Sequence, residues 1–171
     1  METWDAIRAR RNVRSFTDAA IDAAQLDQIL EAGRRAPSSR NWQPWDFVVV
    51  TDREQLRRLS EVWIGARHVA TSAATIALIA PLHEGEREQE LVQYDLGQAT
   101  MSIMLAAADL GIGSGHAAVR EQDLARELLG HPHDRFCAFL IALGHPADRP
   151  LVPLRHPDRR PFEEVVHRGR W

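Results

Sequence analysis

The sequence predicts one domain in which helices alternate with the strands of a central sheet. Two short apolar runs, residues 46–51 and 75–80, and a longer one, residues 136–144, have the length and apolar content of buried strands. The stretches between them carry apolar residues three and four positions apart, which is typical of helices that cover a sheet. A chain of 171 residues suits one hydrophobic core, and we find no repeat that would divide residues 1–171 into further domains.

Each helix is predicted from its apolar spacing and from the residues at its ends. The helix that follows Asp22 is the clearest, because Asp22 can cap its first turn and Gln25 lies three residues on, as in a capping box. Pro37 ends this helix, since the residue before a proline leaves helical backbone space. The predicted helices cover residues 4–10, 22–35, 53–63, 87–110 and 120–129.

Two of the predicted elements are too apolar to face water on any side. Residues 136–144 form an uninterrupted apolar run, so we expect this strand at the centre of the sheet. Residues 101–110, the second half of the long helix, are apolar nearly all round and must be covered on several sides. In a chain of this size, a second copy of the protein is the expected cover.

The composition changes after Pro146. Four prolines lie between residues 149 and 161, which predicts an extended segment, and residues 162–166 are expected to form a last short strand or turn. An extended arm makes few contacts with itself. We therefore expect residues 146–171 to lie on a neighbouring subunit of a homodimer.

The basic and thiol side chains exclude several kinds of chemistry. All 21 basic side chains are arginine, because the sequence contains no lysine. Schiff-base catalysis, pyridoxal phosphate attachment and a phosphate-loop lysine each need an amine and are excluded. The one cysteine, Cys137, lies in an apolar run and is expected to be buried, so a disulfide within the chain and a cysteine-rich metal site are excluded too.

Charge and hydropathy bear on partners and location. A net charge of −3 argues against nucleic acid as the main partner. The sequence starts without the basic residues and apolar run of a secretion signal, and its longest apolar run is too short to span a bilayer. We therefore expect a cytoplasmic protein with no membrane partner.

Two segments carry the residues of a candidate cofactor site. Arg10, Arg11 and Arg14 place three guanidinium groups within five residues, and this planar, multi-donor form of positive charge suits a phosphate. The later segment 37–45 supplies hydroxyls, amides and aromatic rings on a loop bounded by prolines. Together they predict a site for a flat, phosphorylated cofactor. The alternative is that these arginines form surface ion pairs with some of the 24 acidic residues.

Three further motifs are only weak indications of a dinucleotide-binding loop, a metal site or a hydrolase nucleophile. Residues 111–115 have the spacing G-x-G-x-G after a helix, whereas a dinucleotide-binding loop has G-x-G-x-x-G after a strand. His131 and His133 flank a proline and lack a third ligand, so we expect them to be solvated and predict no metal site. The serine pair 38–39 lacks the strand–turn–helix elbow of a hydrolase nucleophile.

The order and spacing of these pieces resemble the FMN-dependent nitroreductase family along essentially the whole chain. The matching pieces are Arg-Arg-x-x-Arg-x-Phe at 10–16, Ala-Pro-Ser-Ser-x-Asn-x-Gln-Pro-Trp at 36–45, Asp95 with the small-residue helix that ends in Leu-Gly-Ile-Gly at 110–113, and Arg-Arg-Pro-Phe-Glu-Glu-Val-Val-His at 159–167. Two features depart from the family pattern. Asn12 stands where the family usually has serine, and the segment between Pro81 and Tyr94 is shorter than in larger members, which leaves the substrate pocket barer.

The resemblance implies an α+β fold with a central, mainly antiparallel sheet flanked by helices. It also implies a homodimer that exchanges its extended C-terminal arms and holds two FMN molecules at the interface. The implied ligands of the FMN phosphate and ribityl chain are Arg10, Arg11, Asn12 and Arg14, with Arg159 and Arg160 from the arm. The implied contributions from the other subunit are Pro37, Ser38, Ser39 and Asn41. The implied neighbours of the isoalloxazine ring, largely through backbone groups, are Gly113, Gly115, His116, Ala117 and Ala118.

The same resemblance implies a reaction. NAD(P)H would donate electrons, and a small oxidised acceptor such as a nitroaromatic or a quinone would receive them in a ping-pong sequence. Because the chain offers no convincing acid–base pair, the flavin would carry the chemistry and we expect no catalytic side chain. Two alternatives remain open: a flavin-fragmenting enzyme of the same superfamily, and a non-catalytic FMN-binding protein.

Overall fold

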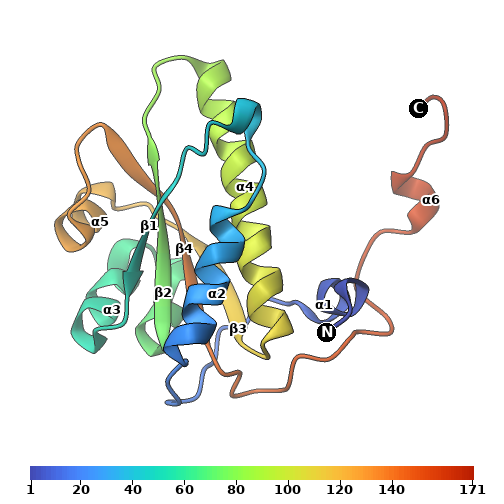
Figure 1. Ribbon diagram of the computed structural model, residues 1–171, viewed down its shortest axis with the longest axis horizontal. Coiled ribbons are helices and arrows are strands. Elements are labelled where there is room, and N and C mark those ends of the chain that lie inside the picture. Colours follow the sequence, from blue (N-terminus) through green and yellow to red (C-terminus); the bar gives the residue numbers. More distant parts are fainter.

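The computed structural model describes residues 1–171, and a four-stranded antiparallel sheet lies at its centre (Figure 1). The strands are β1 (Asp46–Val50), β2 (Ala74–Pro81), β3 (Gly113–Ala118) and β4 (Arg135–Gly144), in the spatial order β1-β2-β4-β3. The continuously apolar strand β4 lies inside the sheet between β2 and β3, as predicted. The α+β class with an antiparallel sheet is therefore confirmed.

Strand β3 is the one strand that the sequence pattern does not predict. Residues Gly113–Ala118 contain no β-branched side chain and no clear alternation. They form a strand because β4 offers an edge, along which all six residues pair from Gly113↔Gly144 to Ala118↔Phe139. Their small size has a purpose, since a Cβ on Gly113 would lie 2.8 Å from Cγ2 of Val13. Tertiary packing, not local propensity, selects this strand.

Five helices agree with the predicted ones to within a few residues, except at the C-terminal end of the helix predicted over residues 53–63. They are α1 (Thr3–Ala9), α2 (Ala23–Arg34), α3 (Arg53–Leu59), α4 (Glu86–Asp109) and α5 (Gln122–Leu129). Asp22 caps α2 as expected, because its carboxylate accepts the N–H of Ala24 at 2.9 Å. The predicted helix over 53–63 is too long. It gives way to 3-10 turns, η2 (Ser60–Val62) and η3 (Ile64–Thr71), because Trp63 has an extended backbone with φ −169°.

The expected strand or turn at 162–166 is instead the short helix α6 (Phe162–Val165). Pro161 precedes its first residue, and Glu163 and Glu164 lie in its first turn. Both features favour the start of a helix, since proline has a helix-compatible φ and acidic side chains interact well with the helix N-terminus.

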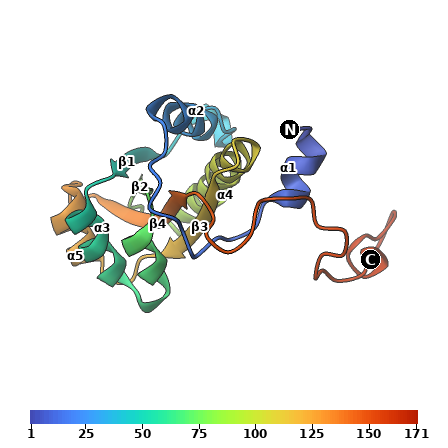
Figure 2. The ribbon, with the colours of Figure 1, turned by 90° about the horizontal axis from the view of Figure 1, so that it is seen from below.

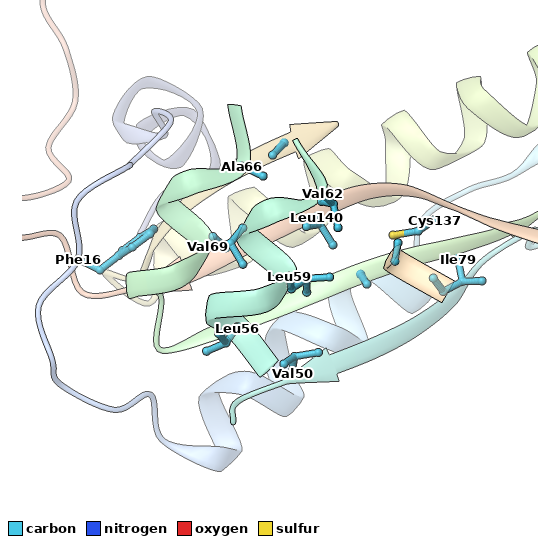
Figure 3. Close-up of a cluster of buried hydrophobic side chains, with 14 of the residues drawn as sticks. Phe16, Val50, Leu56, Leu59, Val62, Ala66, Val69, Ile79, Cys137 and Leu140 are labelled. Atoms are coloured by element: carbon cyan, nitrogen blue, oxygen red, sulfur yellow. The ribbon is translucent and has the colours of Figure 1, made fainter. Parts of the chain in front are cut away.

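Helices cover both faces of the sheet, and a separate hydrophobic cluster fills each side. On one face, α2 and α4 pack on the sheet through residues that include Ile29 and Ile103. On the other face, α3, η3 and α5 cover the sheet, and Leu56, Val69 and Leu140 meet there (Figure 3). These two layers hold the sheet rigidly and leave the outer edge of β3 open to other segments.

Cys137 and His131, two residues that could have been reactive or metal-binding, are both buried in the fold. Cys137 is fully buried in the cluster of Figure 3, and burial raises the pKa of its thiol to about 12, which makes it a poor nucleophile. His131 is also buried, contrary to the expectation that it is solvated, whereas His133 is exposed. No helix has both the length and the hydropathy that crossing a membrane requires.

The N-terminal segment and the segment that follows β4 lie next to each other beside the sheet (Figures 1 and 2). Phe16 forms a bridge with Pro146, and the N–H of Leu154 donates to the carbonyl oxygen of Arg8 at 3.2 Å. From Leu154 onwards every residue is exposed, and the arm with α6 extends away from the body of the molecule (Figure 2).

Candidate functional site

The arginine-rich segment runs in extended form along the open edge of β3. The N–H of Val13 donates to the carbonyl oxygen of Ser114 at 2.8 Å, and Asn12 forms a parallel bridge with Ser114. Val13 is fully buried, while its neighbours Asn12 and Arg14 are exposed. Val13 therefore anchors the side chains that the sequence assigns to the cofactor.

Gly115 permits this close approach. A Cβ at position 115 would overlap the carbonyl oxygen of Val13, so a larger residue would push the N-terminal segment away. The carbonyl oxygen of Gly115 also lies 3.1 Å from Nε2 of the buried His68 on η3. Gly115 thus joins β3, the N-terminal segment and η3 through its backbone.

Three of the predicted ligands line one cavity. Arg10, Asn12 and His116 face residues of α4, including Met101, across a cavity of about 320 Å³. A second cavity, of about 540 Å³, shares Arg10 and Met101 with the first and also contains Arg159 from the C-terminal arm. The structure therefore brings together Arg10 and Arg159, which are far apart in the sequence.

Arg10 and Arg14 carry positive charge that no acidic side chain of the chain neutralises. Arg11 is paired with Asp148, but neither Arg10 nor Arg14 forms an ion pair within the chain. Their charge acts on His116: burial lowers the pKa of this imidazole below its ordinary value, and the positive charges of Arg10 and Arg14 lower it further. Such an uncompensated group of cations favours a negatively charged ligand.

A third cavity, of about 620 Å³, extends this positive region toward η3. It is lined by Arg14, Arg67, His68 and His116, among others. Burial lowers the pKa of His68, a hydrogen bond to Gly115 partly offsets this effect, and the charge of Arg14 lowers the pKa again. Arg67 and His68 cannot be predicted from the sequence, because no motif surrounds them and only the tertiary fold places η3 next to β3.

Two of the predicted phosphate ligands have other partners. Nη2 of Arg11 donates to the Asp148 carboxylate at 2.7 Å and to the carbonyl oxygen of Arg149 at 2.6 Å. The Arg160 guanidinium donates to the carbonyl oxygen of Glu164 at 3.0 Å within the arm. The set of arginines available to a phosphate is therefore smaller than the sequence suggests, because adjacent guanidinium groups serve different purposes.

The isoalloxazine neighbours predicted on β3 divide in the same way. His116 is exposed and lines both the cavity that contains Asn12 and the one that contains Arg14, whereas the methyl group of Ala117 is buried in the hydrophobic core. Ala118 is half-buried and pairs with Phe139. Side chains alternate between the two faces of a strand, so Ala117 can offer a ligand only its backbone groups.

The predicted residues of the 37–41 loop are held by α4 instead. Ser39 begins a 3-10 turn, η1 (Ser39–Asn41), and its N–H lies 3.0 Å from both carboxylate oxygens of Asp95. Asp95 is fully buried on α4 and also accepts from the Ser39 hydroxyl at 3.3 Å and from the Gln98 amide at 3.2 Å. The family resemblance already rests in part on Asp95, but the sequence alone gives no role for this carboxylate.

This loop has an uncommon backbone. Arg40, Asn41 and Gln43 have positive φ angles of 52°, 58° and 55°. A residue other than glycine in this region typically costs about 1–3 kcal/mol and persists only where its surroundings determine it. The Ser38 hydroxyl helps by accepting the N–H of Gln43 at 2.9 Å.

Within one chain, the loop does not reach the arginines. Pro37 lines a groove of about 530 Å³ along α4 with Tyr94 and Met101. The two cavities that contain Arg10 meet this groove only at residues of α4, namely Gly97, Met101 and Leu105, and no residue of the loop lines either of them. One chain therefore holds the two predicted parts of the site in separate cavities along α4.

Comparison with known proteins decides the family. The model of the nitroreductase family matches residues 7–80 and 61–145, which together cover most of the chain. The chain belongs to the nitroreductase family. As a nitroreductase-family member it contains the family's sheet and helices, and the arm after residue 145 lies outside the matched residues.

Three relatives illustrate the range of this family. A protein of Archaeoglobus fulgidus, named provisionally as an NADH dehydrogenase/NAD(P)H nitroreductase, is 34% identical over 174 residues, 99% of both chains. The structure of an FMN-dependent nitroreductase from Clostridium difficile is 25% identical with a TM-score of 0.84, covering 97% of this chain and 98% of that one. NADPH:FMN oxidoreductase from Vibrio harveyi, in complex with NAD+, is 27% identical with a TM-score of 0.85, covering 97% of this chain and 76% of that one.

Proposed function

We propose that this protein is an FMN-dependent oxidoreductase that takes electrons from NAD(P)H and reduces small oxidised acceptors such as nitroaromatics or quinones. The observation that carries the proposal is the uncompensated charge of Arg10 and Arg14 beside β3, in a cavity that Arg10 shares with Asn12 and His116. Family membership and the cofactors in the names of the relatives support it.

The residues present fit the phosphate of FMN. A phosphate dianion in a partly dry site requires paired cations, and charge-assisted arginine contacts are roughly twice as strong as neutral ones. Arg10 and Arg159 line one cavity and would supply this charge. Asn12 beside Arg10 offers an amide to the ribityl hydroxyls, and the backbone of Gly113, Gly115 and their neighbours would lie near the ring.

A homodimer completes the site in this proposal. The loop residues Ser39 and Asn41 are kept away from Arg10 in their own chain, so they would serve the cofactor of the second copy. Tyr94 and Met101 are 68% and 45% exposed on α4, where a partner would cover them. Residues 146–171 would form the exchanged arm of a single 1–171 domain, since they make few contacts with their own chain beyond Leu154.

The chain's own residues bind and orient, and none is assigned a proton-transfer role. Bound FMN would supply the redox chemistry by accepting a hydride from the nicotinamide and passing electrons to the acceptor. The guanidinium groups of Arg10, Arg14 and Arg159 would bind the negatively charged phosphate of FMN. The backbone of β3 would position its isoalloxazine ring. One open face that donor and acceptor use in turn leads to ping-pong order.

Spectroscopy of the purified protein tests this proposal. We expect a yellow protein that releases FMN and not FAD, as judged by mass, and whose absorbance is bleached by NADH or NADPH without oxygen and restored by a nitroaromatic or a quinone. Binding without reduction would indicate a non-catalytic flavoprotein, and oxygen-dependent loss of the flavin would indicate a fragmenting enzyme. Absence of FMN binding after reconstitution would contradict the proposal.

A further inference from the structure

One buried carboxylate links the strained loop to the body of the protein. Asp95 is fully buried, and the donors that reach it are neutral: the backbone N–H and hydroxyl of Ser39 and the side-chain amide of Gln98. A buried charge without an ion-pair partner is costly, and a neutral residue would stabilise the helix more. This position therefore points to a role beyond the stability of α4.

That role concerns the loop of residues 39–43. Its other hydrogen bonds are internal, such as those from the Gln43 N–H to the Ser38 hydroxyl and from the Gln43 amide to the carbonyl oxygen of Asn41 at 3.1 Å. Only Asp95 joins the loop to a helix of the core by hydrogen bonds. Three of the loop's residues have left-handed backbones, which the chain would leave if it were free.

We propose that Asp95 is a positioning residue of the cofactor site, which holds the loop 39–43 in its left-handed conformation before the cofactor binds. The inference rests on the proposed function, in which Ser39 and Asn41 contact the FMN of the second copy. A loop that is already ordered loses little conformational freedom on binding, so the hydrogen bonds of Asp95 contribute to affinity without touching the ligand.

The substitution Asp95→Asn tests the proposal, because it keeps the shape but replaces one acceptor oxygen by an amide donor that repels the Ser39 N–H. Glu88→Gln, at an exposed carboxylate of the same helix that forms no ion pair, is the matched control. In the FMN-free protein, we expect amide hydrogen exchange over residues 38–45 to become about tenfold faster in Asp95→Asn, with β2 and β4 unchanged. The apparent Kd for FMN should rise about tenfold, while both readouts stay at the parent values in the control.

Two further variants keep the test decisive. Arg40→Gly relieves the left-handed strain at an exposed position, so combining it with Asp95→Asn should recover about threefold of the lost affinity. Should Asp95→Asn fail to fold, Ser39→Ala removes the hydroxyl contact from the loop side and should speed exchange about threefold in the FMN-free protein.

The outcomes separate this inference from the proposed function. Failure of the parent protein to bind FMN would count against the function, and the exchange experiment would still test the link to Asp95. Unchanged exchange in the loop would overturn the inference. Faster exchange with an unchanged Kd for FMN would also overturn it, because the link would then have no bearing on the cofactor.

Discussion

Neighbouring arginines in this protein have unlike roles, although the sequence presents them as one cluster. Arg10 faces the cavities, Arg11 ties the N-terminal segment to Asp148, and Arg14 lies beside His116. The sequence predicts where the positive charge gathers, because three guanidinium groups lie within five residues. It does not predict which guanidinium is free, since that depends on a contact with a residue more than a hundred positions away.

The first prediction follows from this division. Arg10→Ala and Arg14→Ala should each weaken FMN binding by about ten- to a hundredfold, because losing a charge-assisted contact to a partly buried phosphate costs roughly 1.5–3 kcal/mol. Fluorescence titration of the FMN-free protein measures the Kd. Arg87→Ala is the control, because its guanidinium is exposed and lies 3.7 Å from Glu90. If all three variants bind within about twofold of the parent, the phosphate lies elsewhere.

Arg11→Ala should separate binding from stability. Its guanidinium closes the contact between the N-terminal segment and the segment that follows β4, so its removal should lower the melting temperature of the FMN-free protein. Because Arg11 does not face the cavities, the Kd for FMN measured on the remaining folded protein should change less than in Arg10→Ala. A Kd as poor as that of Arg10→Ala, with an unchanged melting temperature, would return Arg11 to the phosphate site.

Acid should destabilise the FMN-free protein through two imidazoles whose pKa values are lowered, those of His116 and His68. Burial and the charges of Arg10 and Arg14 lower the pKa of His116, and burial likewise lowers the pKa of His68. The unfolded chain then binds more protons than the folded one, so stability is present above pH 6.5 and is lost as the pH falls below it. Melting temperatures between pH 7.5 and 5.5 should therefore decline, and less steeply in His116→Gln. Equal slopes in parent and variant would contradict this assignment.

The elements show what local pattern does and does not determine. The strands β1, β2 and β4 are predicted because apolar runs bounded by turn residues are a strong local signal. Strand β3 is not, because its conformation comes from the edge of β4 and from Val13, and η3 is missed for a similar reason. Both unpredicted elements border the cavity that contains Arg14 and His116, so the local pattern predicts the arginines of the candidate site but not the strand and the turn beside them.

Gly115→Ala tests the packing of β3 against the N-terminal segment. The new Cβ would overlap the carbonyl oxygen of Val13, so the segment that carries Asn12 and Arg14 must shift. Overpacking of this kind typically costs about 1–3 kcal/mol, and we expect a lower melting temperature together with weaker FMN binding. Thermal melts and titrations on the same samples measure both. Parent-like values would mean that the segment moves aside freely.

At the scale of the whole molecule, three features of one chain support the proposed homodimer. The face of α4 around Met101 and the arm beyond Leu154 are exposed, and the loop with Ser39 is separated from Arg10. The sequence predicts the helix and the arm from their composition. It does not predict how two copies fit together, because this depends on surfaces that form only after folding.

Sedimentation velocity at low micromolar concentration tests the dimer. We expect a dimer with no folded monomer in the parent protein, and dissociation with loss of FMN in Met101→Glu, because a charge would be buried without a partner. Leu82→Glu, at an exposed apolar residue beyond the end of β2, is the control and should leave the dimer intact. A stable monomer that retains FMN would rule out a shared site.

The contact between the N-terminal segment and the segment that follows β4 also sets an order of events during synthesis. Arg10 and Arg14 leave the ribosome early, but the segment that fixes their neighbour Arg11, residues 148–149, is made more than a hundred residues later. A ribosome that adds about 5–20 residues per second finishes the sheet before this contact can close. The nascent chain can therefore bury its core early, whereas the N-terminal segment that carries the proposed phosphate ligands Arg10 and Arg14 is fixed only after the last strand of the sheet has been made.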